Sequence, residues 1–210
     1  ANHINVLARL EDDHATANDG QATFLKSLAD VGILNGGEEK RPGTYEGCGY
    51  APTRTTLLIS NQCNLACKYC YASSGVRGSL MPPELGERAV DFIVANAGEK
   101  GSRKIALGFH GGGEPTLAWE TLTQVTQYAR AQAQEHGLEL SVGVATNACI
   151  SEVQATWLAR NADHVTISLD GPPDIQDRQR PMPNGSPSSP LVERTVSILE
   201  KNGTAYSFQA

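Results

Sequence analysis

Short apolar runs alternate with longer amphipathic segments over most of the chain. The short runs are rich in β-branched and other apolar residues, which is typical of strands buried in a sheet. The longer segments repeat apolar side chains at helical spacing. Strands that alternate with helices indicate an α/β fold, in which right-handed crossovers connect a parallel sheet. The pattern predicts strands at residues 55–60, 104–109, 138–145, 164–169 and 204–209, and helices at residues 83–97, 117–136, 151–160 and 190–202.

The N-terminal part of the chain does not follow this alternation. An acidic polar stretch is followed by apolar residues that recur at helical spacing from Phe24 to Leu34. Asn35-Gly36-Gly37 then provides a helix stop signal. We therefore expect a small helical extension at residues 1–45, a linker at residues 46–52 and the α/β core at residues 53–210.

Composition narrows the class of protein. The chain has 210 residues and 40% hydrophobic content, enough for one core and a small appendage. Its net charge of −6 gives no electrostatic basis for binding nucleic acid. No apolar run is long enough to span a bilayer, and the start lacks the pattern of a signal peptide. We therefore expect neither nucleic acid nor a membrane among its partners.

Closely spaced cysteines give the strongest indication of chemistry. Cys63, Cys67 and Cys70 form a C-x3-C-x2-C pattern directly after the first predicted strand. Thiolates at this spacing can converge on one metal centre, and ordinary cubane clusters take four cysteine ligands, one for each iron. Three local ligands without an evident fourth would leave one iron open to a substrate or cofactor, as in catalytic zinc sites. The pattern therefore favours a reactive iron–sulfur site.

The cysteines and a nearby histidine allow other interpretations. A zinc knuckle would need a fourth Cys or His close by, and the nearest downstream histidine is His110. A disulfide framework is disfavoured because the number of cysteines is odd and the chain is not small. Cys48 and Cys149 are interpreted as unpaired buried cysteines, with extra cluster ligands or catalytic thiols as the alternative. His110 is interpreted as a packed histidine at a strand end, with a metal ligand or proton donor as the alternative.

Polar and glycine-rich segments follow the first four predicted strands. In a (β/α) barrel, functional groups gather at the C-terminal ends of the strands, so these segments are expected to meet in one site. Glycines 111 to 113 allow the backbone to approach a ligand closely, and Glu114 offers a carboxylate suited to an ammonium group. The segments are the cysteine loop, HGGGEP at residues 110–115, Thr146-Asn147, and SLDG at residues 168–171.

The cysteine run resembles the cluster-binding loop of radical S-adenosylmethionine (SAM) enzymes. Within that family it is similar to the branch that modifies peptides and proteins, such as sulfatase-maturing enzymes and ribosomal-peptide maturases. The resemblance implies a partial (β/α)6-type barrel, with about five βα units present here. It also implies a 4Fe–4S cluster on Cys63, Cys67 and Cys70 that cleaves SAM to methionine and a 5′-deoxyadenosyl radical. The radical would abstract hydrogen from a peptide or protein side chain, as in formylglycine or crosslink formation.

The resemblance assigns contacts with SAM to two of the strand ends. Gly112, Gly113 and Glu114 belong to a Gly-Gly-Glu-Pro motif that would clamp the amino group of SAM. Asn147 and Ser168 would form hydrogen bonds with its ribose or carboxylate. No residue is assigned as catalytic.

Further contacts are implied near the fourth predicted strand and in the cysteine loop. Asp170 belongs to a Ser-x-Asp-Gly motif, continued by Asp177 and Arg180 in an Asp-x-x-Arg pattern like that of related maturases. Arg180 would pair with a carboxylate, whereas turn formation or helix capping accounts equally well for both aspartates. Tyr69 matches the aromatic residue that usually precedes the third cysteine, a position compatible with simple packing. Ala148 departs from the family, which usually has glycine there.

The resemblance also implies partners and a location. The substrate would be a peptide or protein, the electron would come from a reducing partner such as flavodoxin or ferredoxin, and the thiols indicate a reducing, cytoplasmic location. Residues 1–45 would be a leader-peptide-recognition element, although a solvated helical extension accounts for the pattern more simply. We expect the sequence to be the N-terminal part of a longer protein, because the C-terminal auxiliary-cluster domain is absent from this chain.

Two other functions are left open by the sequence. One is a non-catalytic iron–sulfur module for electron transfer, and the other is a small-molecule radical SAM enzyme in cofactor synthesis. An electron carrier has no need for an ammonium clamp, so the Gly-Gly-Glu-Pro motif argues against the first. Assays with SAM and candidate peptides would separate the second from a peptide maturase.

Overall fold

The structure is a computed structural model that describes residues 19–31, 50–72 and 78–210. The chain divides into a unit that ends at Gly49 and a unit that begins at Tyr50. In the first unit the described residues form helix α2 (Asp19–Asp30), within the predicted extension. Cys48 and the predicted stop signal lie outside the described residues.

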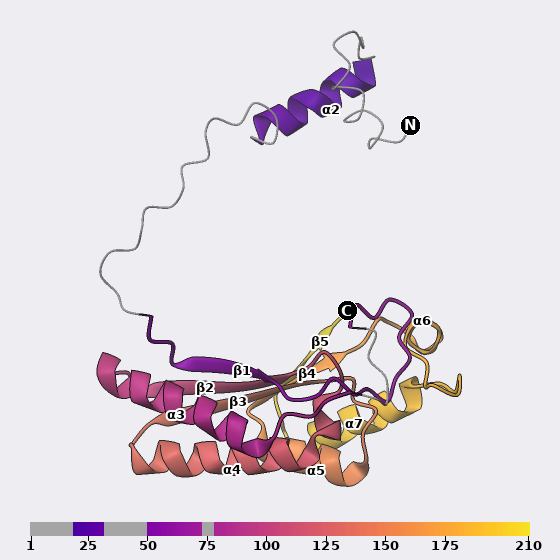
Figure 1. Ribbon diagram of the computed structural model, residues 1–210. Coiled ribbons are helices and arrows are strands. Elements are labelled where there is room, and N and C mark those ends of the chain that lie inside the picture. The colour runs from indigo at the N-terminus through magenta and orange to yellow at the C-terminus, as the bar shows by residue number, and fades with distance from the viewer. Residues whose placement is uncertain (1–18, 32–49, 73–77) are drawn as a thin grey trace. The chain divides into compact units, whose positions relative to one another are not determined.

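A parallel sheet forms the centre of the second unit. Its strands follow one another in chain order, so that each crossover connects direct neighbours (Figure 1). Such an order places the helices on one face of the sheet, as the wall of a partial barrel requires. The sequence-based prediction of an α/β fold is therefore confirmed. The strands are β1 (Arg54–Leu58), β2 (Lys104–His110), β3 (Glu139–Thr146), β4 (His164–Ser168) and β5 (Tyr206–Gln209).

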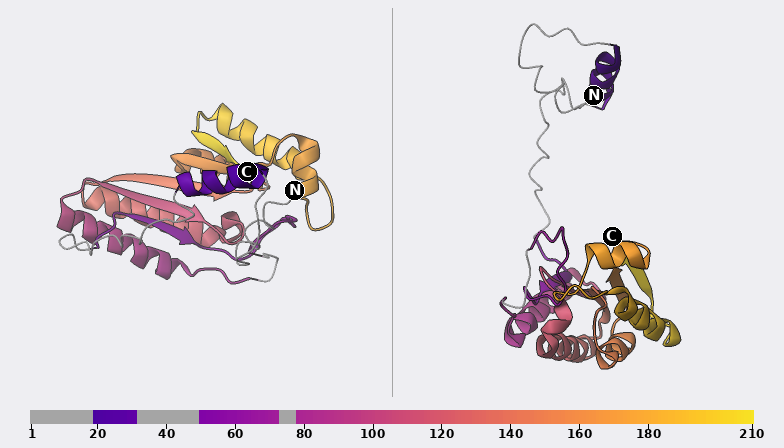
Figure 2. Two further views of the ribbon diagram at one scale, coloured as in Figure 1. Left: turned by 90° about the horizontal axis from the view of Figure 1, so that it is seen from above. Right: turned by 90° about the vertical axis from the view of Figure 1, so that its right-hand side faces the viewer.

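Helices α3, α4, α5 and α7 cover the outer face of this sheet (Figure 2). The sequence placed all of them, with small differences at their ends. It missed two short elements, α6 and the 3-10 turn η2, because a few residues beside prolines do not establish a helical period. None of the described helices is long and apolar enough to cross a bilayer. The helices are α3 (Pro83–Lys100), α4 (Trp119–Glu135), α5 (Glu152–Asn161), α6 (Pro173–Gln179) and α7 (Ser189–Lys201), with η2 at Pro115–Leu117.

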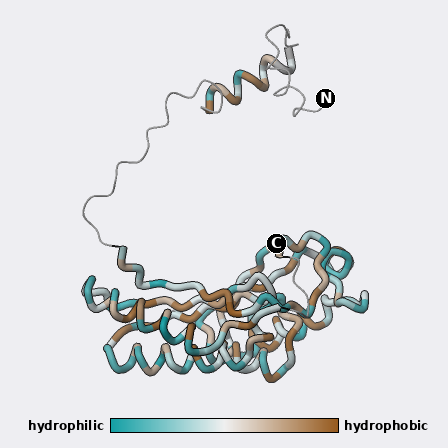
Figure 3. Tube along the Cα trace, viewed as in Figure 1, coloured by the Kyte–Doolittle hydropathy of each residue, from teal (hydrophilic) through white to brown (hydrophobic). Residues whose placement is uncertain are grey.

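Alternation along the strands separates the core from the opposite face of the sheet. On β2 the side chains of Ile105, Leu107 and Phe109 are buried, whereas Ala106 and Gly108 are partly exposed. Successive residues of a strand point to opposite faces, so the buried set packs beneath the helices. Hydrophobic residues accordingly concentrate along the strands and the helix faces that cover them (Figure 3). The polar segments expected from the sequence follow the C-terminal ends of the strands.

Candidate active site

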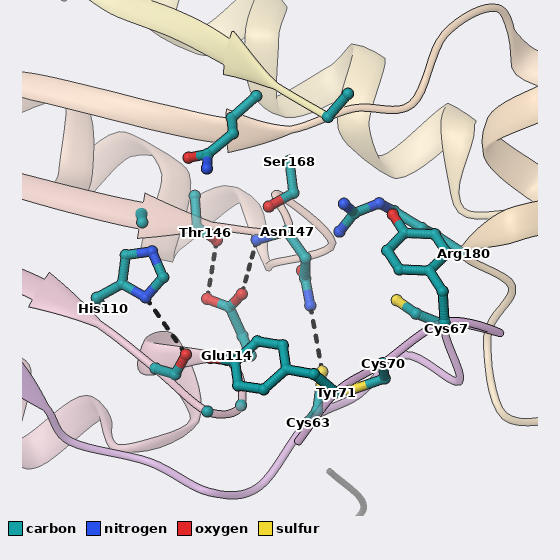
Figure 4. A pocket seen from close by; sticks show the side chains of 17 residues that line it. Cys63, Cys67, Cys70, Tyr71, His110, Glu114, Thr146, Asn147, Ser168 and Arg180 are labelled. Carbon is teal, nitrogen blue, oxygen red and sulfur yellow. Dashed lines mark hydrogen bonds between the residues drawn. The ribbon is translucent and has the colours of Figure 1, made fainter. Parts of the chain in front are cut away.

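A cavity of about 200 Å³ lies at the C-terminal ends of the strands (Figure 4). It is lined by residues that follow β1, β2, β3 and β4, together with the end of β5. The structure therefore brings these segments together at one edge of the parallel sheet, as the sequence predicts. Of the residues singled out from the sequence, the cavity is lined by Cys63, Cys67, Tyr69, Cys70, Gly112, Gly113, Glu114, Asn147, Ser168 and Arg180.

The cysteine loop is held by backbone hydrogen bonds to the segment where α6 ends, residues 179–181. The backbone N–H of Ala66 donates to the Pro181 carbonyl at 2.8 Å, and that of Lys68 donates to the Gln179 carbonyl at 2.9 Å. Within the loop, the Leu65 side chain is buried. Helix α6, which the sequence patterns did not predict, therefore ends in the segment that supports the cysteine loop.

The thiols of this loop share a partly buried environment. Burial raises the pKa of Cys63 and of Cys67. The nearby Arg180 guanidinium opposes this shift at Cys67, whereas the neighbouring thiols reinforce it. A site that must hold thiolates needs positive charge close by, which a metal centre would supply.

The arrangement of the thiols does not fit a mononuclear metal site. Among the described residues, no group of three His, Cys, Asp or Glu side chains could hold a single metal ion. In a cubane cluster each cysteine binds a different iron, so the sulfurs need not converge on one point. Three soft sulfur donors on one cavity wall therefore fit an iron–sulfur cluster better than the zinc alternative.

The glycine loop after β2 lies directly against the backbone that leads into the cysteine loop. Gly113 N–H donates to the Ser60 carbonyl at 3.0 Å, and Glu114 N–H donates to the Gln62 carbonyl at 2.7 Å. A Cβ atom on Gly113 would lie 2.0 Å from the Gln62 oxygen, which no side chain can tolerate. Glycine is thus required here to join the two loops, as well as to leave room for a ligand.

Glu114 is buried, with 2% of its surface exposed, and fixes the neighbouring strand ends. Its Oε1 accepts hydrogen bonds from the Thr116 N–H at 3.1 Å, the Thr116 hydroxyl at 2.7 Å and the Thr146 hydroxyl at 2.8 Å. Its Oε2 accepts from the Asn147 N–H at 2.7 Å. The carboxylate thereby connects the ends of β2 and β3 (Figure 4).

This carboxylate is suited to an ammonium group in the cavity. Burial raises the pKa of Glu114, and the hydrogen bonds from Asn147 and Thr116 oppose that shift. Oε2 accepts a single hydrogen bond from the described residues and so retains acceptor capacity. Within the described part of the chain, Glu114 forms no ion pair with Lys, Arg or His. A cationic ligand would therefore find a buried carboxylate whose charge is not neutralised.

Replacing Glu114 with glutamine is expected to lower the free energy of unfolding by about 2 kcal/mol. In either orientation the new NH2 group faces the backbone N–H of Thr116 or of Asn147, so one buried donor loses its acceptor. Urea denaturation would measure the change. Glu139→Gln is the matched control, because that side chain is 68% exposed and should change stability by less than about 0.5 kcal/mol. Equal effects of the two substitutions would contradict the role given to Glu114.

Asn147 and Ala148 form a tight turn at the end of β3. Ala148 has a φ of 60°, a left-handed conformation that favours glycine. This explains physically why the family usually has glycine at this position. The Asn147 side chain faces the cysteine loop, with its Nδ2 3.7 Å from Cys63 Sγ and 2.8 Å from Asn64 Oδ1.

Arg180 reaches the cavity from the segment after α6 and is held by Asp170. Arg180 Nε donates to Asp170 Oδ1 at 2.7 Å, and both side chains are largely buried. The Tyr69 hydroxyl also donates to Asp170, at 2.6 Å to Oδ2, and the guanidinium lies 5.3 Å from the Tyr69 ring centroid. Burial and the bond to Asp170 raise the pKa of Tyr69. Asp170 is not among the cavity-lining residues, so it orients Arg180 from behind.

The structure separates the two aspartates that the sequence treated alike. Asp177 caps α7, since its Oδ1 accepts hydrogen bonds from Ser188 N–H at 2.9 Å and Ser189 N–H at 2.7 Å. Helix capping is therefore the role of Asp177 in this structure. Asp170 instead forms the ion pair with Arg180.

Several cavity residues were missed or misplaced by sequence reasoning. His110 was predicted to be packed, but it is exposed and lines the cavity. The alternation of side chains along β2 could have indicated this exposure. Because Phe109 is buried, the next residue, His110, points to the opposite face of the sheet. Tyr71, 85% exposed, and Gln209 also line the cavity without having been singled out. Cys149 is buried with its pKa raised to about 12 by burial, and it does not line the cavity.

Comparison with known proteins identifies relatives of this chain. The sequence is 32% identical over 160 residues to the mycofactocin maturase MftC of Mycobacterium ulcerans, covering 74% of this chain and 38% of the relative. It is 27% identical over 152 residues to the cysteine-type anaerobic sulfatase-maturating enzyme of Clostridium perfringens, covering 70% and 41%. The solved structure of native anSMEcpe with bound AdoMet and Cp18Cys peptide superposes with a TM-score of 0.65 and 28% identity, over 75% of this chain and 42% of that one.

The family assignment rests on the segment that builds the cavity. The chain spans between 34% and 47% of the length of the curated relatives it matches. The match to the Radical SAM superfamily itself covers residues 57–204, from the C-terminal end of β1 to the loop before β5. This segment contains the cysteine loop, the glycine loop, Asn147 and Arg180. The chain therefore belongs to the Radical SAM superfamily, whose members use a 4Fe–4S cluster and SAM.

Proposed function

We propose that this chain is part of an enzyme that cleaves SAM at a 4Fe–4S cluster and removes a hydrogen atom from a peptide or protein side chain. One observation carries the proposal. The sulfurs of Cys63, Cys67 and Cys70 share one cavity with a buried carboxylate, Glu114, and a guanidinium, Arg180. Three thiols, an anion and a cation are the groups needed to hold a cluster and the two charged ends of an amino acid.

When bound, the cluster supplies the electron that cleaves SAM to methionine and a 5′-deoxyadenosyl radical. The chain's own residues would bind SAM and orient it. Glu114 would accept hydrogen bonds from the ammonium group of SAM through Oε2, beside the backbone of Gly112 and Gly113. Arg180, whose Nε is bound to Asp170, would offer its terminal amino groups to the carboxylate, with Ser168 beside it.

A non-catalytic electron carrier accounts poorly for this cavity. Electron transfer would require the cysteines, but not a buried carboxylate that has no cationic partner among the described residues, nor an oriented guanidinium beside them. The four hydrogen bonds to Glu114 offset part of the free-energy cost of burying its charge, and a cationic ligand would offset more of it. Glu114 and Arg180 therefore favour binding of an amino acid group over electron transfer alone.

The proposal of a peptide or protein substrate is supported by the relatives. Two of them are named as maturases that act on sulfatases or on mycofactocin, and a solved neighbour holds a peptide beside AdoMet. The modification would be formylglycine formation or crosslinking, with the electron supplied by a flavodoxin or ferredoxin. The partly exposed thiols support a reducing, cytoplasmic location.

The N-terminal extension belongs to the proposal as a recognition element for a leader peptide. Of residues 1–45, the structure describes helix α2 and the residue that follows it. A helix of 12 residues is marginal in isolation, so packing against a partner would stabilise it. Residues 46–52 would serve as the linker to the radical SAM core at residues 53–210.

The test is anaerobic reconstitution of the full-length protein with iron and sulfide, followed by reduction in the presence of SAM. Mass spectrometry should detect 5′-deoxyadenosine, and deuterium from a labelled candidate peptide should appear in it. Deoxyadenosine without deuterium from any peptide, but with deuterium from a labelled small molecule, would favour cofactor synthesis. A reconstituted cluster that never cleaves SAM would refute the proposal.

A further inference from the structure

Both polar atoms of the Asn147 side chain have partners, and its Nδ2 contacts the cysteine loop. Nδ2 lies 2.8 Å from Asn64 Oδ1 and 3.7 Å from Cys63 Sγ, and Oδ1 accepts the Cys149 N–H at 2.8 Å. The amide orientation is fixed, because only the oxygen can accept from the Cys149 N–H. Both Nδ2 hydrogens are therefore directed at the loop, and 8% of the residue is exposed. This arrangement differs from the direct bond to SAM that the family resemblance implied.

The backbone of the same residue is bound to the carboxylate proposed for the SAM ammonium. Asn147 N–H donates to Glu114 Oε2 at 2.7 Å, while the Asn147 side chain contacts Cys63 Sγ. One residue thus joins the anion of the SAM site to a sulfur of the cluster site. Ala148, held at a φ of 60°, completes the turn that brings both ends of Asn147 into place.

Hydrogen bonds to the sulfurs of an iron–sulfur cluster are among the factors that set its reduction potential. A donor stabilises negative charge on sulfur, and the reduced cluster carries more of that charge. An N–H directed at a ligand sulfur therefore makes the cluster easier to reduce. Partners that orient the ligands of a metal centre commonly matter nearly as much as the ligands themselves.

We propose that Asn147 is a positioning residue that acts through Cys63: it donates a hydrogen bond to the cluster-bound sulfur and raises the reduction potential of the cluster. The proposal rests on the function proposed above, since it takes Cys63 as a cluster ligand. It assigns Asn147 to the cluster rather than to the ribose or carboxylate of SAM.

The test is a redox titration of the reconstituted protein without SAM, followed by electron paramagnetic resonance of the reduced cluster. Asn147→Leu removes both donors at similar volume, and the reduced-to-oxidised ratio at a fixed potential should fall about tenfold, or about 59 mV for a one-electron couple. Asn64→Leu is the matched control: it removes the loop contacts of Asn64 but leaves the bond from Asn147 to sulfur, so its potential should match the wild type.

The outcomes separate this proposal from the one it rests on. Equal shifts in both variants would mean that disturbance of the loop moves the potential, and no shift in Asn147→Leu would mean that the sulfur bond has no effect; either result overturns the proposal. If Asn147→Leu lost its cluster, Asn147→Ala would carry the test, since it removes the donor without adding bulk or a charge near the cluster. Failure of the wild-type protein to assemble a cluster would instead refute the proposed function.

Discussion

A Cys67→Ala variant is expected to hold no intact 4Fe–4S cluster and to form no detectable 5′-deoxyadenosine from SAM. The cysteine loop supplies three sulfurs to the cavity, and loss of one leaves two protein ligands for four irons. Cys67 lies in the part of the loop whose backbone is held by the segment after α6, so a neighbouring side chain cannot move in to replace it. Iron and sulfide content, visible absorption and a deoxyadenosine assay would measure the loss.

Cys149→Ala is the matched control for this experiment. Cys149 is a buried thiol that follows the end of β3, and it does not line the cavity. Its replacement should leave a small cavity costing roughly 1 kcal/mol of stability, with iron content and deoxyadenosine yield unchanged. Full SAM cleavage by Cys67→Ala would show that the cluster is held elsewhere. A loss of iron from Cys149→Ala equal to that from Cys67→Ala would show that the cavity was assigned to the wrong thiols.

Gly113→Ala is expected to lower the free energy of unfolding by about 3 kcal/mol, at the upper end of overpacking effects. The added Cβ would lie 2.0 Å from the Gln62 oxygen and 2.6 Å from the Gln62 carbonyl carbon. Both atoms belong to the backbone carbonyl whose oxygen accepts the hydrogen bond from Glu114 N–H, so relief would require the two loops to separate. Urea denaturation would measure stability, and the iron content after reconstitution should fall because the cysteine loop is displaced.

Gly98→Ala is the opposite case in the same protein. Gly98 lies in the last turn of α3, and a Cβ there would meet nothing within 4 Å. Alanine is favoured over glycine in helices by about 0.5–1 kcal/mol, so this variant should be slightly more stable than the wild type. If Gly113→Ala were as stable as Gly98→Ala, the glycine loop and the cysteine loop would not be as rigidly joined as the structure indicates.

Local patterns were sufficient to predict the fold because the strands and the longer helices each carry a complete signal. The run at residues 164–169 is short and β-branched, and it became β4. The segment predicted as a helix at residues 151–160 begins with Ser151, whose side chain caps α5 by accepting the Gln154 N–H at 3.2 Å. Helix α6 has seven residues and follows Gly171-Pro172, so its sequence looks like a turn. Its importance for the cysteine loop comes from contacts more than a hundred residues away in sequence, which no local pattern encodes.

The sequence predicted which residues form the site, but not which hydrogen bonds and ion pairs connect them. Parallel strands bring their C-terminal ends to one edge, so the residue types found there could be assigned to one cavity. What each side chain does depends on tertiary partners. Glu114 has a structural role besides its proposed contact with a ligand, because its Oε1 accepts a hydrogen bond from the Thr146 hydroxyl on the next strand at 2.8 Å. Asp170 turned out to face Tyr69 and Arg180 because α6 folds the chain back, a geometry that spacing alone does not give.

The support of the cysteine loop by the segment after α6 has a consequence for local opening. The amides of Ala66 and Lys68 are bonded to the carbonyls on either side of Arg180, those of Pro181 and Gln179. Hydrogen exchange at these two amides with solvent therefore requires the segment that carries the guanidinium to detach at the same time. The loop and Arg180 form one opening unit, so a ligand that fixes the guanidinium should slow deuterium uptake at Ala66 and Lys68 without touching either residue.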